Sequence, residues 1–346
     1  MAYELPYENS MRPVPIPECL LATVTPVMAG PTQGSLNAVA NFSANADAES
    51  LKKAMKGLGC DNKAVLEILC RRTNQQRQQI KSAYKTMYGK DLVQDLISEL
   101  HGHFEDVIVA LMFTPDEFDA RELKRAMKGA GTDEATLIEI MCTRTNAEIN
   151  GIKQAYKRMF KEDLESAISG DTSGHFKRML ISLCTAGRDE SHIVDRVRAV
   201  KQAQDLHEAG VKRWGTDEAT FNAILCAENH SQLLQVFEEY KKLSGHDIEQ
   251  AIKTEFSGDI LEGLLTIVKC VKNRPAVFAE RLHRSMAGAG TDDSALIRVV
   301  VGRCEKDMVQ IKDEFQRMYK KSLESWIKGD TSGKYKDALL ILIGAK

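Results

Sequence analysis

A short glycine motif recurs along the chain, and an acidic residue follows each copy at one fixed distance. The pattern Gly-x-Gly-[Thr/Cys]-Asp occupies residues 57–61, 129–133 and 288–292, and the variant Trp-Gly-Thr-Asp occupies residues 214–217. Forty residues after the last glycine of each motif come, in turn, Glu99, Asp171, Glu255 and Asp330. Hard divalent cations prefer oxygen ligands, and calcium suits this set best. The pattern therefore predicts one calcium site for each motif.

The second motif illustrates how such a site is built. The preceding helix is expected to end at Met127-Lys128-Gly129, where the last carbonyls have no partner within the helix. Gly129 and Gly131 permit the left-handed turns that let several carbonyls converge, and Asp171 is placed to add a bidentate carboxylate. Three carbonyls and two carboxylate oxygens fall short of the roughly 6–8 ligands that calcium takes, so positions remain for other oxygen donors.

Charge predicts what completes such a site. One carboxylate against a divalent ion leaves about +1 on each loop, which suits a phosphate oxygen of an anionic lipid. Four bound ions would change the formal net charge from −2 to +6 and attract the chain to a negative leaflet. Several weak contacts made together raise the avidity. We therefore expect a calcium-switched membrane binder.

The motifs belong to a longer internal repeat. A shift of 72 residues places Cys70 on Cys142 and Tyr84 on Tyr156, and a shift of 159 places residues 170–174 on residues 329–333. A period near 70 residues exceeds that of the common solenoids, so each copy is expected to be a small multi-helix bundle. We expect four such copies.

Within one copy the apolar residues follow a helical period. Breaks near 129–132, 146, 161–163 and 169–174 divide the second copy into five helices, and no segment alternates like a strand. Thr132 and Asp133 are well suited to cap the second helix. The fold class is therefore predicted to be all-α.

Composition narrows the function further. The 346 residues are 43% hydrophobic and 28% charged, which is typical of a globular protein, and the charge of −2 lacks the basic surplus of a nucleic-acid binder. The eight cysteines form no CxxC pair and are expected to be reduced and mostly buried, apart from an accessible Cys60. No apolar run approaches the roughly 20 residues of a membrane span.

Residues 1–40 hold six of the eight prolines and match none of the copies, so we expect a flexible arm. The stretch 19–29 resembles a signal peptide only faintly, since Glu4, Glu8 and Pro26 do not suit one.

Two other function classes stay open beside membrane binding. A helical scaffold for protein partners predicts binding that survives chelation, with the glycines serving only as helix caps. An enzyme is not expected, because the HExxH, G-x-S-x-G and Walker patterns are missing. The segment Gly329–Lys334 has the glycines and the lysine of a Walker loop, but the spacer between them is one residue too short. His101 and His103 are expected to be solvated, although they follow Glu99 and could tune its site with pH. Trp326 is expected in the core.

Taken together, the Met-Lys-Gly-x-Gly-Thr-Asp loops, the acid forty residues later, the Gly-Asp-Thr-Ser-Gly segments and the four repeats resemble the annexin family over residues 41–346. The resemblance implies a slightly curved disc of four five-helix repeats, with calcium loops on its convex face and the arm on its concave side. It also implies reversible, calcium-dependent binding to acidic phospholipids such as phosphatidylserine. The expected boundaries are 1–40 for the arm, 41–113, 114–185, 198–272 and 273–346 for the repeats, and 186–197 for a linker.

The resemblance also assigns ligands. The sets that it implies are Met55, Gly57 and Gly59 with Glu99; Met127, Gly129 and Gly131 with Asp171; Gly210, Arg213 and Gly215 with Glu255; and Met286, Gly288 and Gly290 with Asp330. Lys56, Lys128 and Trp214 are the implied lipid contacts, whereas the fourth loop carries Ala287 in place of a lysine.

The expected cofactor is Ca²⁺, with up to one main site per repeat. The expected partners are acidic phospholipid membranes, and a protein partner of the arm and lateral self-assembly on membranes are left open. The expected location is the cytoplasm, with peripheral membrane attachment when calcium rises and room for an extracellular pool.

Overall fold

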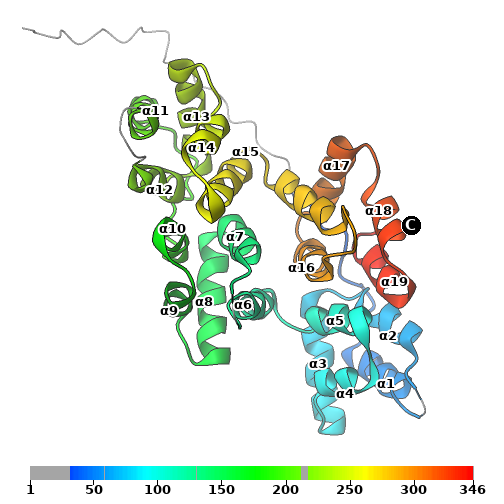
Figure 1. The fold of residues 1–346 in the computed structure, drawn as a ribbon. Coiled ribbons are helices and arrows are strands. Elements are labelled where there is room, and N and C mark those ends of the chain that lie inside the picture. Colours follow the sequence, from blue (N-terminus) through cyan, green and yellow to red (C-terminus); the bar gives the residue numbers. More distant parts are fainter. Residues whose placement is uncertain (1–31, 58, 130, 212–216, 346) are drawn as a thin grey trace, which may run out of the picture. The chain divides into compact units, whose positions relative to one another are not determined.

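The computed structural model describes residues 32–57, 59–129, 131–211 and 217–345, and these residues form 19 α-helices and no β-strand (Figure 1). The predicted all-α fold is confirmed. None of the described helices combines the length and the apolar character needed to cross a bilayer.

Each of the first two repeats folds as five helices. Those of repeat 1 are α1 (Ala44–Ala54), α2 (Asn62–Leu69), α3 (Asn74–Tyr88), α4 (Leu92–Glu99) and α5 (Gly102–Leu111). Those of repeat 2 are α6 (Pro115–Ala126), α7 (Glu134–Thr143), α8 (Asn146–Phe160), α9 (Leu164–Asp171) and α10 (Gly174–Cys184).

The last two repeats share one long, kinked helix. Repeat 3 contains α11 (Arg196–Val211), α12 (Glu218–Ala227), α13 (His230–Ser244), α14 (Ile248–Glu255) and the first part of α15 (Gly258–Met286). Repeat 4 contains the second part of α15, followed by α16 (Asp293–Arg303), α17 (Met308–Tyr319), α18 (Leu323–Asp330) and α19 (Gly333–Leu342).

The kink in α15 separates the fifth helix of repeat 3 from the first helix of repeat 4. Asn273 is extended there, with φ −163° and ψ 89°, and its Oδ1 accepts a hydrogen bond from the Ala276 N–H at 3.1 Å. Pro275 has no N–H to continue the helical ladder. The predicted five-helix unit therefore holds in all four repeats.

The second helix of each repeat begins at the aspartate of the glycine motif. Asp61, Asp133, Asp217 and Asp292 all accept hydrogen bonds from backbone N–H groups in the first turn of α2, α7, α12 and α16. Such caps satisfy N–H groups that have no partner in the helix. The motif aspartates are thus structural, and the prediction that Asp133 caps its helix is confirmed.

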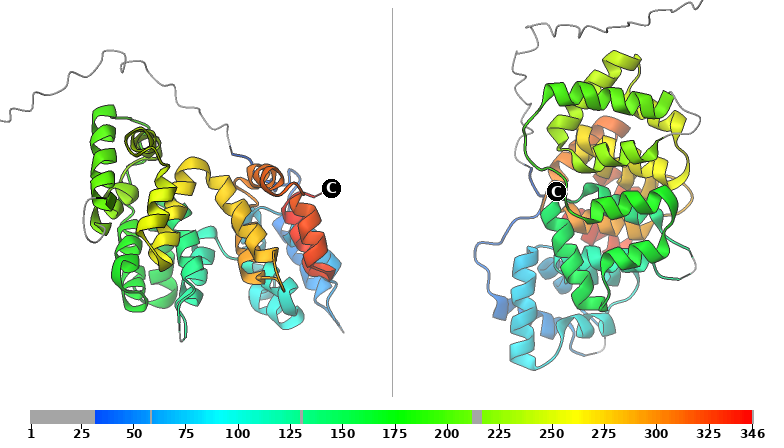
Figure 2. Two further views of the ribbon diagram at one scale, coloured as in Figure 1. Left: turned by 45° about the horizontal axis from the view of Figure 1, so that its top comes forward. Right: turned by 90° about the vertical axis from the view of Figure 1, so that its left-hand side faces the viewer.

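Two hydrophobic cores join the repeats in pairs. One core combines buried residues of repeats 1 and 4, where α5 packs against α16 and α19. The other combines repeats 2 and 3, where α10 packs against α12 and against α15 (Figure 2). Each repeat therefore completes its core with a neighbour, and repeat 1 does so with the repeat that is farthest from it in sequence.

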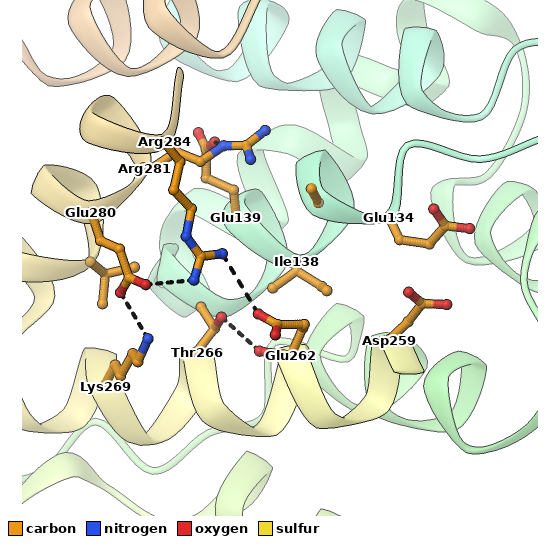
Figure 3. A pocket seen from close by; sticks show the side chains of 12 residues that line it. Glu134, Ile138, Glu139, Asp259, Glu262, Thr266, Lys269, Glu280, Arg281 and Arg284 are labelled. Carbon is orange, nitrogen blue, oxygen red and sulfur yellow. Dashed lines mark hydrogen bonds and ion pairs between the residues drawn. The ribbon is translucent and has the colours of Figure 1, made fainter. Parts of the chain in front are cut away.

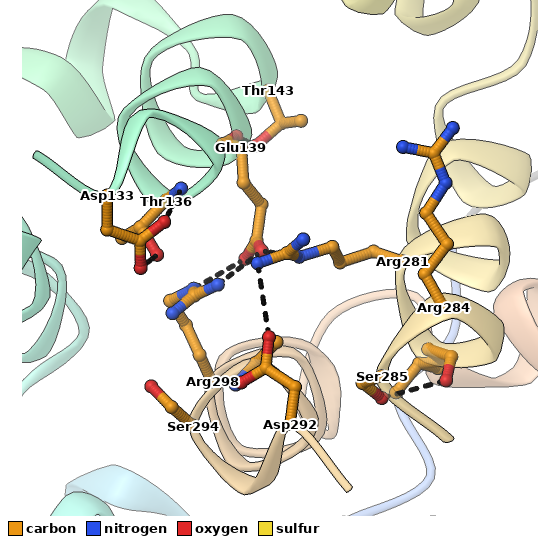
Figure 4. A network of polar contacts seen from close by, with 12 residues as sticks. Asp133, Thr136, Glu139, Thr143, Arg281, Arg284, Ser285, Asp292, Ser294 and Arg298 are labelled. Atoms are coloured by element: carbon orange, nitrogen blue, oxygen red, sulfur yellow. Dashed lines mark hydrogen bonds and ion pairs between the residues drawn. The ribbon is translucent and has the colours of Figure 1, made fainter. Parts of the chain in front are cut away.

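Buried ion pairs add a link between repeats 2 and 4. Arg298 on α16 donates to Glu139 on α7 from Nε at 3.0 Å and from Nη2 at 2.8 Å, and Arg281 on α15 donates to the same carboxylate at 3.1 Å (Figure 4). Burial alone would raise the pKa of Glu139, but the two arginines outweigh it and lower the pKa. Breaking such a buried pair on one side leaves a charge without compensation, so these contacts tie the two repeats together.

The last residues of the predicted arm are attached to the repeats. The Leu36 N–H donates to the Cys304 carbonyl at 3.0 Å, and the Val309 N–H donates to the Gln33 carbonyl at 3.1 Å. Gln76 Nε2 donates to the Val39 carbonyl at 2.9 Å. Residues 33–39 therefore bridge repeats 4 and 1, whereas residues 1–31 lie outside the described part of the chain.

Candidate functional site

The first glycine loop has the backbone geometry that the sequence predicts. Helix α1 gives way to Met55, after which Gly57 and Gly59 adopt φ values of +112° and +86°. A Cβ atom added at either glycine would touch nothing within 4 Å, so glycine is required for its backbone conformation and not for space. The Asp61 N–H closes the loop by donating to the Ala54 carbonyl at 2.8 Å.

The loops of repeats 2 and 4 have the same geometry. Gly129 and Gly131 have φ values of +108° and +100°, and Gly288 and Gly290 have φ values of +142° and +94°. In both loops the N–H of the motif aspartate donates to a carbonyl near the end of the preceding helix at 2.8 Å, as it does in repeat 1. These three repeats therefore share left-handed motif glycines and the same closing hydrogen bond.

The loop carbonyls are available to a ligand. Within the described residues, no hydrogen-bond donor reaches the carbonyl oxygens of Met127, Gly129 or Gly131. The same holds for the corresponding carbonyls of repeats 1 and 4, namely those of Met55, Gly57, Gly59, Met286, Gly288 and Gly290. An unpaired row of carbonyl oxygens suits a hard cation.

A threonine of the loop holds the distant acid in two of the repeats. Thr132 Oγ1 donates to Asp171 Oδ2 at 2.7 Å, and Thr291 Oγ1 donates to Asp330 Oδ2 at 2.5 Å. The acids at the ends of α9 and α18 thus lie beside the loops that their spacing paired them with. The sequence pattern assigned Thr132 to helix capping and did not reveal this contact, although a threonine at the same place in three of the four motifs was the available signal.

Repeat 1 lacks this threonine. Cys60 takes its place and is partly exposed, and burial raises the pKa of its thiol, with Glu99 and Asp61 adding to the rise. The carboxylate of Glu99 therefore lies near the loop, but a thiol is a weaker hydrogen-bond donor than a hydroxyl. The other described cysteines are also unpaired, and most are buried, as expected.

Repeat 3 is described only in part. A Cβ atom placed on Gly210 would lie 3.4 Å from Cγ of Glu255, so the structure brings these two predicted ligands together. The Asp217 N–H donates to the Ala209 carbonyl at 3.1 Å, which matches the closing bond of the other loops. Arg213, Trp214 and Gly215 lie outside the described residues.

The predicted ligands fit calcium through backbone oxygens and one carboxylate per loop. Within the described ranges, no three His, Cys, Asp or Glu side chains are grouped so that they could hold a metal ion. This donor set, rich in carbonyls and lacking thiolate or imidazole, favours a hard cation over zinc. Lys56 and Lys128, the predicted lipid contacts, are exposed beside their loops.

His103 is exposed, as expected for a solvated residue, and its ring also meets two carboxylates. Nδ1 lies 3.1 Å from Asp106 Oδ2 and Nε2 lies 3.2 Å from Asp293 Oδ2. The ring therefore connects α5 of repeat 1 with the start of α16 in repeat 4. Trp326 packs against the core as expected, edge-on to His283 at a centroid distance of 4.7 Å.

A cavity lies between α7 and the two parts of α15 (Figure 3). Its volume is about 290 Å³. Glu280 pairs there with Lys269 at 2.8 Å and with Arg284 at 2.6 Å, while the Thr266 hydroxyl donates to the Glu262 carbonyl at 2.7 Å. The charged groups named here are therefore paired with one another, and the Thr266 hydroxyl is engaged by a backbone carbonyl.

Comparison with known proteins identifies the repeat. The annexin family profile matches four segments, residues 46–111, 118–183, 201–267 and 277–342, and each lies within one of the expected repeats. Annexin A4 of Mus musculus is 53% identical over 311 residues, which cover 90% of this chain and 98% of that protein.

Solved structures agree with the sequence relatives. The structure of annexin III superposes with a TM-score of 0.90 at 46% identity, covering 91% of this chain and 98% of that one. The structure of calcium-bound annexin (Sm)1 superposes with a TM-score of 0.82 at 34% identity, covering 90% and 93%. With four matched repeats, the predicted fold and these relatives, the chain belongs to the annexin family.

Proposed function

We propose that this annexin binds acidic phospholipid membranes reversibly when calcium rises, through the glycine loops of its repeats. The observation that carries the proposal is the repeated union of a left-handed glycine loop with a distant acid, made by Thr132 with Asp171 and by Thr291 with Asp330. A helix cap alone does not require that acid. The family resemblance implies the same function, namely calcium-dependent binding to phospholipids.

In this proposal each loop contributes backbone carbonyl oxygens and one carboxylate as ligands. In repeat 2 these are the carbonyls of Met127, Gly129 and Gly131 with the carboxylate of Asp171. The equivalent sets in the other repeats are Met55, Gly57, Gly59 and Glu99; Gly210, Arg213, Gly215 and Glu255; and Met286, Gly288, Gly290 and Asp330. When bound, calcium supplies positive charge and coordination positions for a lipid phosphate oxygen.

Side chains around the loops add to membrane contact. Lys56 and Lys128 are exposed and stand directly before the first glycine of their motifs, where an ammonium group attracts a phosphate. Trp214 adjoins the loop glycine of repeat 3, and an indole at that place favours the lipid interface. Phosphatidylserine is the proposed lipid, and the proposed outcome is to organise or aggregate membranes or to shield that lipid.

The proposed location follows from this switch. The chain resides in the cytoplasm at low calcium and becomes peripheral on membranes when calcium rises, and an external pool on cell surfaces needs no signal peptide. Lateral self-assembly on the membrane and a protein partner for residues 1–40 belong to the same proposal. Catalysis and nucleic-acid binding are not part of this proposal.

Co-sedimentation with liposomes tests the proposal. Phosphatidylserine and phosphatidylcholine vesicles are compared with calcium and with excess chelator, for the wild type and for a variant that combines Glu99→Gln, Asp171→Asn, Glu255→Gln and Asp330→Asn. We expect the wild type to pellet only with the acidic lipid and calcium, and the folded variant to stay in solution. Binding that survives chelation, or a variant that pellets equally well, would instead support a helical scaffold.

A further inference from the structure

A second cavity lies where repeats 1, 2 and 4 meet. Its volume is about 340 Å³, and it is lined by α4 and α5 of repeat 1, α6 of repeat 2 and the start of α16 in repeat 4, together with Phe113 between α5 and α6. Cavities that hold small molecules have volumes of roughly 300–1,000 Å³, so this one is large enough for a small ligand. It shares no lining residue with the cavity beside Thr266.

Part of the lining is apolar and is not fully covered by the protein. Six apolar side chains line the cavity, namely those of Ile97, Val109, Ala110, Phe113, Phe118 and Ile297. Ile97 is 39% exposed, and Val109 and Phe113 are only partly buried. Removing apolar surface from water is favourable, so this part of the lining suits a ligand with an apolar body.

Most of the charged groups in the lining are paired with one another. His103 lies between Asp106 and Asp293, at 3.1 and 3.2 Å from their carboxylates. Arg125 pairs with the carboxylate of Glu122. These groups therefore already have partners within the protein.

Arg121 on α6 is the cation of the lining that lacks a carboxylate partner. Its guanidinium carbon lies 4.0 Å from the centre of the Phe113 ring, and no hydrogen bond or ion pair joins its side chain to another of the described residues. Stacking covers one face of the guanidinium but leaves the N–H donors in its plane free for an anion. Partial burial lowers the pKa of this group, although much of the side chain remains exposed and within reach of a solute.

Glu105 on α5 is an anion of the same lining that also lacks a partner. Within the described ranges, its side chain forms no hydrogen bond or ion pair. Glu105, Val109 and Phe113 are spaced four residues apart, so they follow one face of α5 and its continuation. At about 1.5 Å per residue, Glu105 and Phe113 are separated by roughly 12 Å along the axis. The lining therefore has a free carboxylate at one end, apolar surface in between and a free guanidinium at the other end.

We propose that this cavity binds a small bipolar molecule of the ω-amino acid class, with an anion at one end, an ammonium group at the other and an apolar chain between them. The anion pairs with Arg121, the ammonium group pairs with Glu105, and the chain covers Val109 and Ile97. Each pairing supplies a partner that the protein itself does not provide, and hydrogen bonds between two charged groups are the strong ones. The site uses none of the predicted calcium ligands, so the inference does not depend on the proposed function.

Titration calorimetry of the full chain in excess EDTA tests the site with 8-aminooctanoate, whose extended chain is similar in length to the separation of the two charges. Octanoate and octylammonium are the matched probes, since each keeps the chain and lacks one charge. We expect the wild type to bind one 8-aminooctanoate per chain, roughly tenfold or more tightly than either matched probe. Arg121→Gln should remove the advantage over octylammonium, and Glu105→Gln should remove the advantage over octanoate. Arg178→Gln on α10 is the control variant, because Arg178 is exposed and lies outside the lining.

Three results would overturn the proposal. The first is no saturable binding of millimolar 8-aminooctanoate to the folded wild type. The second is an equal affinity for the three probes, because the two charges would then play no part in binding. The third is full affinity in Arg121→Gln or in Glu105→Gln, or an equal loss in the Arg178 control. Circular dichroism checks that each variant is folded, and neither substitution removes a hydrogen bond within the described part of the fold.

Discussion

Replacing Thr132 with valine should weaken calcium binding at the second loop without unfolding it. The hydroxyl donates to Asp171 Oδ2 at 2.7 Å and approaches the Asp171 carbonyl at 3.2 Å, so it fixes the orientation of the acid. Valine has nearly the same shape and keeps the β-branch, but it leaves the carboxylate free to rotate. The substitution therefore isolates the orienting hydrogen bond.

The magnitude follows from what changes on binding. A hydrogen bond to a carboxylate stabilises a fold by about 1.5–3 kcal/mol, but this one is present before calcium arrives, so most of that energy cancels. What remains is the cost of fixing one side chain, about 0.5–1.5 kcal/mol. We expect the dissociation constant to rise by about 2- to 13-fold.

The assay is calcium titration calorimetry in a background that carries Glu99→Gln, Glu255→Gln and Asp330→Asn, so that only repeat 2 binds. Thr132→Ser keeps the hydroxyl and should restore most of the affinity. Thr172→Val is the matched control, because the Thr172 hydroxyl donates to the Ile168 carbonyl at 2.6 Å and not to the acid. A dissociation constant within a factor of two of the parent, or an equal effect of the control, would refute the reasoning.

Three further predictions concern the loops and the ion pairs. Cys60→Thr should tighten calcium binding by repeat 1 about 2- to 13-fold in calorimetry, by supplying Glu99 with the missing hydroxyl, and no change would contradict this role. Gly131→Ala should lower the free energy of unfolding by about 1–2 kcal/mol in urea titration, since alanine is strained at φ +100°; Gly170→Ala, where φ is not positive, is its control. Burial would raise the pKa of Glu148, but Lys306 and the Thr145 N–H outweigh it and lower the pKa to about 2. Its stabilisation is therefore complete above pH 4.5 and lost as the pH falls through 2, so the deficit of Glu148→Gln in urea unfolding should shrink over that range; a constant deficit would show that the ion pair is not its source.

The sequence predicted the local structure well because the signals were local. Gly57 and Gly59 indicate a left-handed backbone, and the constant separation between each loop and an acid indicates that the two meet in the fold. The spacing of the residues was therefore enough to pair each loop with its acid. Thr132 was misassigned because a threonine that precedes a helix suits a cap as well as a distant hydrogen bond. Only the fold brings Asp171 within 2.7 Å of it.

Other features depend on contacts that a pattern cannot specify. Apolar periodicity shows which face of α5 is buried but not that it packs on α16 and α19. The long helix α15 hides the boundary between two repeats, since only Asn273 leaves helical geometry.

The pairing of the cores sets an order for folding during synthesis. Repeats 2 and 3 follow one another along the chain, so their common core can form as soon as the first part of α15 has left the ribosome. Repeat 1 emerges first, but its core also contains residues from Phe278 to Ile343, so it must wait for almost the whole chain. During that interval its apolar surface is exposed, and exposed apolar surface favours aggregation and binding by chaperones. A chain that ends before α16 should therefore fold the core of repeats 2 and 3, while the core of repeat 1 remains incomplete.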